Sequence, residues 1–173
     1  MNRAFCKYLK REDGNSTIEF VIMFPLVLMI FMSMFEAAMI TARQAMLERA
    51  LDITMRGVRI TTGSAPSADA IRAKICNLGT ILPDCNTTLI MEMTPVAPPD
   101  FDMPDYRIPC INRDQLPAPV TTFTQGVGNQ LMVVRACYVV DPVFPLSGAG
   151  LGLSRAEDGG YQIVSASAFV AEP

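Results

Sequence analysis

Residues 15–58 decide the fold of this chain: NSTIEFVIMFPLVLMIFMSMFEAAMITARQAMLERALDITMRGV. The sixteen residues 20–35 carry no charge and are almost entirely apolar. With Ile18 and residues 37–40 added, the segment reaches the roughly 20 residues that a membrane-spanning helix needs. Pro25 lacks an N–H and clashes with the preceding turn, so we expect a kink or a loosened turn near Phe24.

The second half of this stretch predicts a continuation of the same helix. Residues 37–58 are rich in Ala, Met, Leu, Arg and Glu, which are good helix formers. Spacings of three and four residues predict one apolar stripe, made of Met39, Ala42, Met46, Ala50, Ile53 and Gly57. The sequence therefore predicts one long helix, with its first half in lipid and its second half against a folded domain.

The charges around the apolar run predict its orientation. Residues 1–14 hold four basic and two acidic side chains, whereas the chain as a whole has a net charge of -3. A basic flank keeps the N-terminus in the cytoplasm, which sends the rest of the chain outward. The short basic leader ends in Gly14, and we predict cleavage between Gly14 and Asn15 on the cytoplasmic side. The alternative is a conventional secretory signal that is cleaved near Ala42, in AMITA.

Two carboxylates flank the uncharged run. Near a helix centre a carboxylate costs roughly 2.5–3.5 kcal/mol on insertion scales, so Glu19 at the head of the run suggests a role in assembly. Its alternative role is that of a solvated carboxylate at the helix start, favoured by the helix dipole. Glu36 is expected only to mark the far membrane interface.

The five cysteines fit the predicted orientation. Cys6 lies alone in the leader, and the other four follow the apolar run in a compartment that should be oxidising. A zinc site is disfavoured because the chain has no CxxC pair and no histidine. We predict two disulfides rather than free buried thiols. Of the three possible connectivities we favour Cys76–Cys85, which closes a short loop, with Cys110–Cys137.

The remainder of the chain predicts a small α+β domain. Ser67 or Asp69 can cap a short helix that includes Ile71, Ile75 and Leu78. Three strands are predicted in TTLIMEMT (87–94), QLMVVRACYVV (130–140) and YQIVSASAFVA (161–171). We expect an antiparallel sheet of these strands, with the long helix packed on the small residues Val164, Ala166, Ala168 and Val170. The predicted organisation is a leader at 1–14, a transmembrane helix at 15–40 and an exported domain at 41–173.

Other functional classes find little support in the sequence. The proline-rich segment 95–119 predicts an irregular excursion between two strands. Its Asp100, Asp102 and Asp105 could in principle form a cation site, but a solvated acidic loop is favoured because no calcium-loop glycine or following glutamate is present.

The absence of histidine excludes Ser-His-Asp and Cys-His arrangements, so we expect neither an enzyme nor a cofactor. The modest charge gives no indication of nucleic-acid binding, and GAGLG lacks the context of a nucleotide site.

The leader, Gly14, NSTIEF, the apolar run with Pro25, Glu36 and then TARQAMLERA together resemble the TadE-like pseudopilins of tight-adherence (Flp) pilus systems. Glu19 and Phe20 are similar to the Glu-aromatic pair that follows the cleavage glycine in Flp-type prepilins. The resemblance implies cleavage by a prepilin peptidase. It also implies a structural role as a minor pseudopilin in the bacterial inner membrane, with other pseudopilins and the pilus assembly platform as partners. The alternative is an uncleaved, membrane-tethered periplasmic binding module.

Overall fold

The structure is a computed structural model that describes residues 15–61, 66–99, 101, 103, 108–114, 119–144, 156, 158 and 160–172. The leader, including Gly14 and Cys6, lies outside these residues, as do Asp100, Asp102 and Asp105. The elements in chain order are α2 (Asn15–Arg59), α3 (Ala68–Leu78), α4 (Cys85–Thr88), β1 (Leu89–Val96), β2 (Leu131–Val140) and β3 (Tyr161–Val170).

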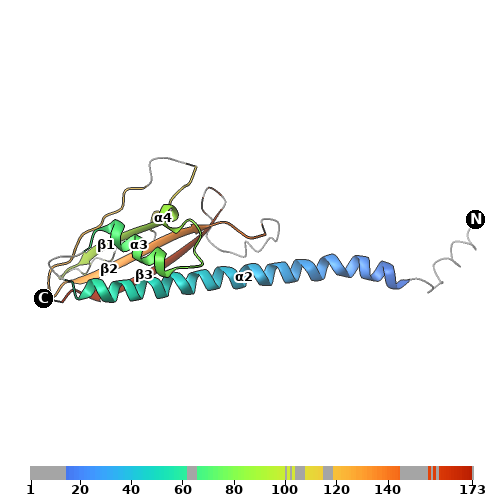
Figure 1. The fold of residues 1–173 in the computed structure, drawn as a ribbon, viewed down its shortest axis with the longest axis horizontal. Helices are drawn as coiled ribbons and strands as arrows, with labels where there is room; N and C mark the ends of the chain where they lie inside the picture. The colour runs from blue at the N-terminus through green and yellow to red at the C-terminus, as the bar shows by residue number, and fades with distance from the viewer. Residues whose placement is uncertain are drawn as a thin grey trace, which may run out of the picture.

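One long helix and a small sheet form the molecule, as predicted for an α+β fold (Figure 1). Helix α2 has 45 residues and continues through Pro25. Its first half extends alone, and its second half lies along the sheet (Figure 1). The sheet is antiparallel in the order β1-β2-β3, with Leu89 opposite Tyr138 and Val140 opposite Tyr161.

The buried face of α2 differs from the predicted stripe. Ile53 is 40% exposed and Ala42 is exposed, so the prediction was rotated by about one residue around the helix. The longer side chains of Leu47, Leu51 and Met55 fill the core instead, because they bury more apolar area than the alanines and glycine of the predicted stripe. The buried side chains of α2 are Glu36, Ile40, Leu47, Ala50, Leu51, Thr54, Met55 and Val58.

The packing of β3 also corrects an expectation. Its helix-facing side carries Tyr161, Ile163 and Ser165, whereas Val164 and Val170 are 42% and 48% exposed. The register explains this orientation, since Ile163 lies opposite Tyr138, whose side chain belongs to the same buried cluster. The small apolar residues that were expected to receive the helix face away from it. In β2 the core residues are Met132, Val134, Ala136, Tyr138 and Val140.

Helix α3 begins as the sequence predicts. The Ser67 side chain caps it by accepting a hydrogen bond from the Ala70 N–H. Its Ile71 and Ile75 are buried in the shared core. The predicted start of the first strand is wrong by two residues, because Thr87 and Thr88 belong to the short helix α4 and β1 begins at Leu89.

Two disulfides link segments between the helices and strands to this core. The structure pairs Cys76 at the end of α3 with Cys85 at the start of α4, and Cys110 with Cys137 in the middle of β2. This is the connectivity that we favoured. The second bridge lies on the sheet face opposite α2, beside the cross-strand ion pair of Glu92 and Arg135, and ties the proline-rich excursion to that face.

Candidate functional site

The first half of α2 is a bare apolar helix. Every residue from 16 to 35 is exposed except Ser33, which is half-buried. Leu26, Met29 and Phe31, for example, are 55%, 68% and 70% exposed. Among the described residues, α2 is the one helix that is long and apolar enough to cross a membrane. The twenty residues span about 30 Å, which matches the hydrocarbon core of a bilayer.

Ser33, within this half, has a local partner for its polar group. Its hydroxyl donates a hydrogen bond to the Met29 carbonyl at 2.8 Å, which satisfies this hydroxyl in an apolar environment. The rings of Phe20 and Phe24 stack on successive turns with centroids 5.2 Å apart. The surface of this half is therefore suited to lipid or to another apolar helix.

The residues proposed for cleavage and assembly cluster at the start of α2. Gly14 lies outside the described residues, and Asn15 is the first residue of the helix. Glu19 and Phe20 are both exposed, about one turn further along. Within the described part of the chain, Glu19 has no hydrogen-bond or ion-pair partner. A partner for this carboxylate would have to come from elsewhere.

Glu36 joins the bare half of α2 to the domain. Its side chain is fully buried, and its two carboxylate oxygens accept hydrogen bonds from the backbone N–H groups of Val143 and Phe144 at 3.0 and 2.9 Å. The ring of Phe144 also meets that of Phe35 edge-on, with centroids 5.9 Å apart. The sequence marked Glu36 only as an interfacial charge. Its partners follow it by more than 100 positions, so no local signal could reveal this contact.

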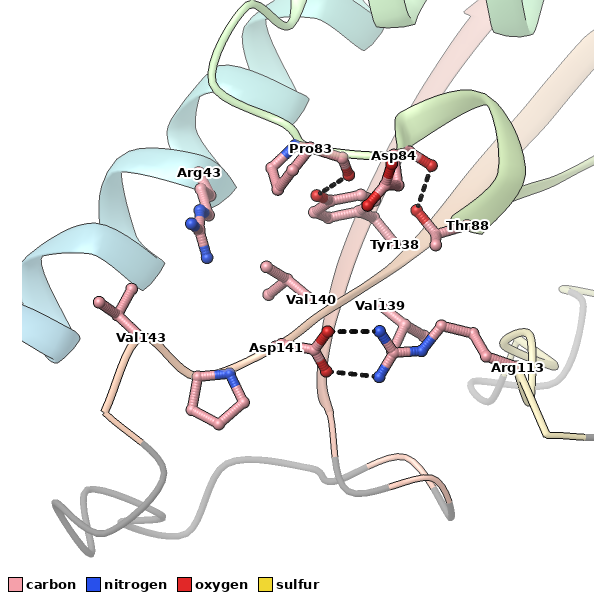
Figure 2. Close-up of a pocket in the computed structure, with 11 residues that line it drawn as sticks. Arg43, Pro83, Asp84, Thr88, Arg113, Tyr138, Val139, Val140, Asp141 and Val143 are labelled. Atoms are coloured by element: carbon pink, nitrogen blue, oxygen red, sulfur yellow. Dashed lines mark hydrogen bonds and ion pairs between the residues drawn. The ribbon is translucent and has the colours of Figure 1, made fainter.

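A pocket of about 270 Å³ lies directly beyond this junction (Figure 2). Arg43 of α2 reaches toward it from one side, and Tyr138 of β2 and Asp141, directly after β2, border it (Figure 2). The Tyr138 hydroxyl donates to the Pro83 carbonyl at 2.7 Å, and burial raises the pKa of Tyr138 to about 12. Within the described part of the chain, Nε and Nη1 of Arg43 are buried without a hydrogen-bond partner.

Arg113 also lines the pocket and forms ion pairs with two aspartates. Its guanidinium donates two hydrogen bonds to Asp141, at 2.7 and 2.6 Å, and one to Asp158 at 2.6 Å. The hydrogen bonds from Arg113 hold the pKa of Asp141 below its usual value. Burial works to raise the pKa of Asp158, but hydrogen bonds from Arg113 and from the Gly160 N–H outweigh it and lower this pKa. The sequence analysis did not single out Arg113, because its two partners lie 28 and 45 positions away.

The comparison with protein families found a match for the segment that forms most of α2. The family model described as TadE-like protein matches residues 14–56. The comparisons with curated proteins and with solved structures each found no match. The matched segment covers the bare half of α2, Glu36 and most of the half that packs on the domain. Residues 14–56 of this chain are therefore similar to TadE-like proteins, and the match does not extend into the rest of the domain.

Proposed function

We propose that this protein is a minor pseudopilin that takes a structural, non-catalytic role in the assembly of Flp/Tad pili. In this proposal a prepilin peptidase cleaves the chain after Gly14 on the cytoplasmic side of the inner membrane. The apolar half of α2 then anchors the chain in the bilayer with the C-terminal domain in the periplasm. Other pseudopilins and the assembly platform are its partners.

The observation that carries the proposal is the division of α2 into two halves. One continuous helix is exposed over 16–35, apart from half-buried Ser33, and from Glu36 onward one of its faces is buried in its own domain. A helix built in this way presents an exposed apolar segment that is continuous with a helix packed on the domain. The segment can lie in a membrane and later pack against the same segments of other subunits, since both environments accept an apolar surface.

Glu19 gives this packing a defined register. Cleavage after Gly14 would create a positively charged amino group on Asn15, one turn away from the carboxylate. In an apolar bundle an unpaired carboxylate is costly, so a cationic group on an adjacent helix would favour one axial position over others. The lack of a partner for Glu19 within the described part of the chain leaves it available for such a pair.

The cleavage proposal is tested by mass spectrometry of protein extracted from membranes of the natural host. The expected N-terminus is Asn15. The Gly14→Arg variant should keep its leader, because a peptidase site shaped for a residue without a side chain cannot admit a long cation. An intact leader in the wild-type protein, or an N-terminus near Ala42, would overturn this part of the proposal.

Assembly is tested separately with Glu19→Ala. This variant should be cleaved and inserted normally but should fail to support piliation or to co-purify with other pseudopilins. Glu48→Ala is the matched control, because Glu48 is an exposed carboxylate on the domain half of the same helix. Normal piliation and co-purification in Glu19→Ala would reduce Glu19 to a solvated helix-start carboxylate.

A further inference from the structure

The junction at Glu36 fixes a second part of the chain at the level of the membrane surface. We propose that the segment Asp141–Phe144, which follows β2, lies in the lipid head-group layer and holds the domain against the bilayer. This inference rests on the proposed membrane anchoring by α2. The partner it names is the lipid interface itself.

The first step is the position of the bilayer along α2. The run of large, exposed apolar side chains ends at Phe35, and the next residue, Glu36, is fully buried. Because the large apolar side chains stop there, we place the boundary of the hydrocarbon core at Phe35, within the predicted helix 15–40; residues 16–35 match its thickness of about 30 Å. The lipid therefore ends where the domain begins.

The second step is the depth of the segment after β2. Glu36 holds the N–H groups of Val143 and Phe144 through both of its oxygens, and the Phe144 ring touches the Phe35 ring. Figure 2 shows Val143 beside α2. Val143 and Phe144 thus lie at the same depth as the last lipid-facing turn of the helix. The Val143 side chain is 40% exposed there.

The third step is the order of polarity along this segment. Val143 and Phe144 are apolar, and the first charge before them is Asp141, which is paired with the guanidinium of Arg113. Two apolar side chains next to a paired charge match the change in polarity from the hydrocarbon core to the head-group layer. With an aromatic ring at the boundary, the segment has the chemistry of an interfacial anchor.

The opposite end of the domain provides an internal reference. Val127 precedes β2, whose first residue lies opposite Val170 at the end of β3. That end of the sheet is close to the C-terminal end of α2, because Arg59 forms an ion pair with Glu172. Val127 lies at this end, far along α2 from the apolar half. Its side chain is 68% exposed, so it serves as a reference position away from the membrane.

The chain contains no tryptophan, which allows a clean fluorescence experiment. Three single-tryptophan variants, Met29→Trp, Val143→Trp and Val127→Trp, are reconstituted into phosphatidylcholine vesicles. The lipids carry bromine either near the head group or near the end of the acyl chain. Bromine quenches tryptophan at short range, so the loss of intensity reports depth. Iodide in the buffer reports exposure to water.

We expect the tryptophan at 29 to lose most intensity to the deep bromines and the tryptophan at 127 to respond only to iodide. The tryptophan at 143 should be quenched mainly by the shallow bromines, with a blue-shifted emission relative to position 127. Adding Glu36→Ala to Val143→Trp should reduce this quenching, because the segment loses its attachment to the helix.

Two failures are distinguishable. If position 29 is quenched by bromine but position 143 behaves like position 127, the interfacial segment is refuted and the anchor stands. If position 29 is not quenched, membrane anchoring by α2 itself is refuted and this inference falls with it. Should Val143→Trp fail to fold by circular dichroism, Phe144→Trp replaces one ring with another at the same depth and is judged by the same outcomes.

Discussion

At the scale of single residues, Glu36 is the contact on which the arrangement of helix and domain depends. Charged hydrogen bonds contribute about 1.5–3 kcal/mol each, and Glu36 accepts two of them in a buried site. Glu36→Ala should therefore destabilise the domain by about 2–4 kcal/mol in urea unfolding of the detergent-solubilised protein. The amide protons of Val143 and Phe144 should also exchange faster.

Glu48→Ala serves as the reference for this prediction. Glu48 is exposed on the same helix, and removing it should change stability by no more than about 0.5 kcal/mol. A Glu36→Ala protein as stable as Glu48→Ala, with unchanged exchange at Val143, would show that the two hydrogen bonds contribute nothing net.

Arg113 sets the response of the domain to acid. The folded-state pKa values of Asp141 and Asp158 are both lowered, whereas an aspartate in the unfolded chain has a pKa of about 3.9. The stability that they provide is complete above that value and is lost as the pH falls through the lower folded pKa values. The urea midpoint should therefore fall steeply below about pH 4.

Arg113→Met reverses this pattern. Without the guanidinium, burial dominates at Asp158, whose side chain is 2% exposed, and its folded pKa rises. The variant should be less stable than the wild type at neutral pH and should lose less stability on acidification, or even gain some. Parallel acid profiles for the two proteins would contradict the role given to Arg113.

At the scale of elements, the two faces of α2 give a direct comparison. Leu51 is 1% exposed in the core, whereas Ile53, two residues along, is 40% exposed. Leu51→Ala should cost about 2–5 kcal/mol, because it removes buried methyl groups and leaves a cavity. Ile53→Ala removes a similar amount of apolar surface from a partly exposed position and should cost less than about 1 kcal/mol.

Thermal unfolding of the two variants tests which face of the helix is buried. Equal losses, or a larger loss for Ile53→Ala, would favour the stripe that the sequence suggested. The same comparison shows why that stripe was rotated. Spacings of three and four residues recur on more than one face of a helix with many Ala, Met and Leu residues, and only the partner surface selects between them.

At the scale of the whole molecule, the two disulfides constrain loops of different length. Cys76 and Cys85 are 9 positions apart, and Cys110 and Cys137 are 27 positions apart. Replacing either pair by serine should destabilise the domain by about 2–4 kcal/mol. The longer loop should cost up to about 1 kcal/mol more, since it restricts the unfolded chain more strongly.

Urea unfolding of the Cys76→Ser/Cys85→Ser and Cys110→Ser/Cys137→Ser proteins measures the two contributions. Alkylation before and after reduction counts the bridges in the wild type. Four reactive thiols beyond the helix in the unreduced wild-type protein would show that the bridges do not form.

The sequence by itself determined the long helix, the three strands and the α+β class. It did so because helix formers, uncharged length and strand alternation are local properties that survive any packing. For the cysteines the sequence only favoured one of three pairings, and the structure decided it by joining Cys76 to Cys85 and Cys110 to Cys137. The TadE-like character of residues 14–56 is carried by the same local pattern.

The tertiary structure alone decided which faces are buried and which distant groups meet. The rotation of the α2 stripe and the reversed orientation of β3 both follow from fitting large side chains between helix and sheet, which no single element specifies. The contact of Glu36 with Val143 and the ion cluster of Arg113 join positions far apart in the chain. Such pairs form only when the fold brings the elements together, so their physical origin is packing and not sequence pattern.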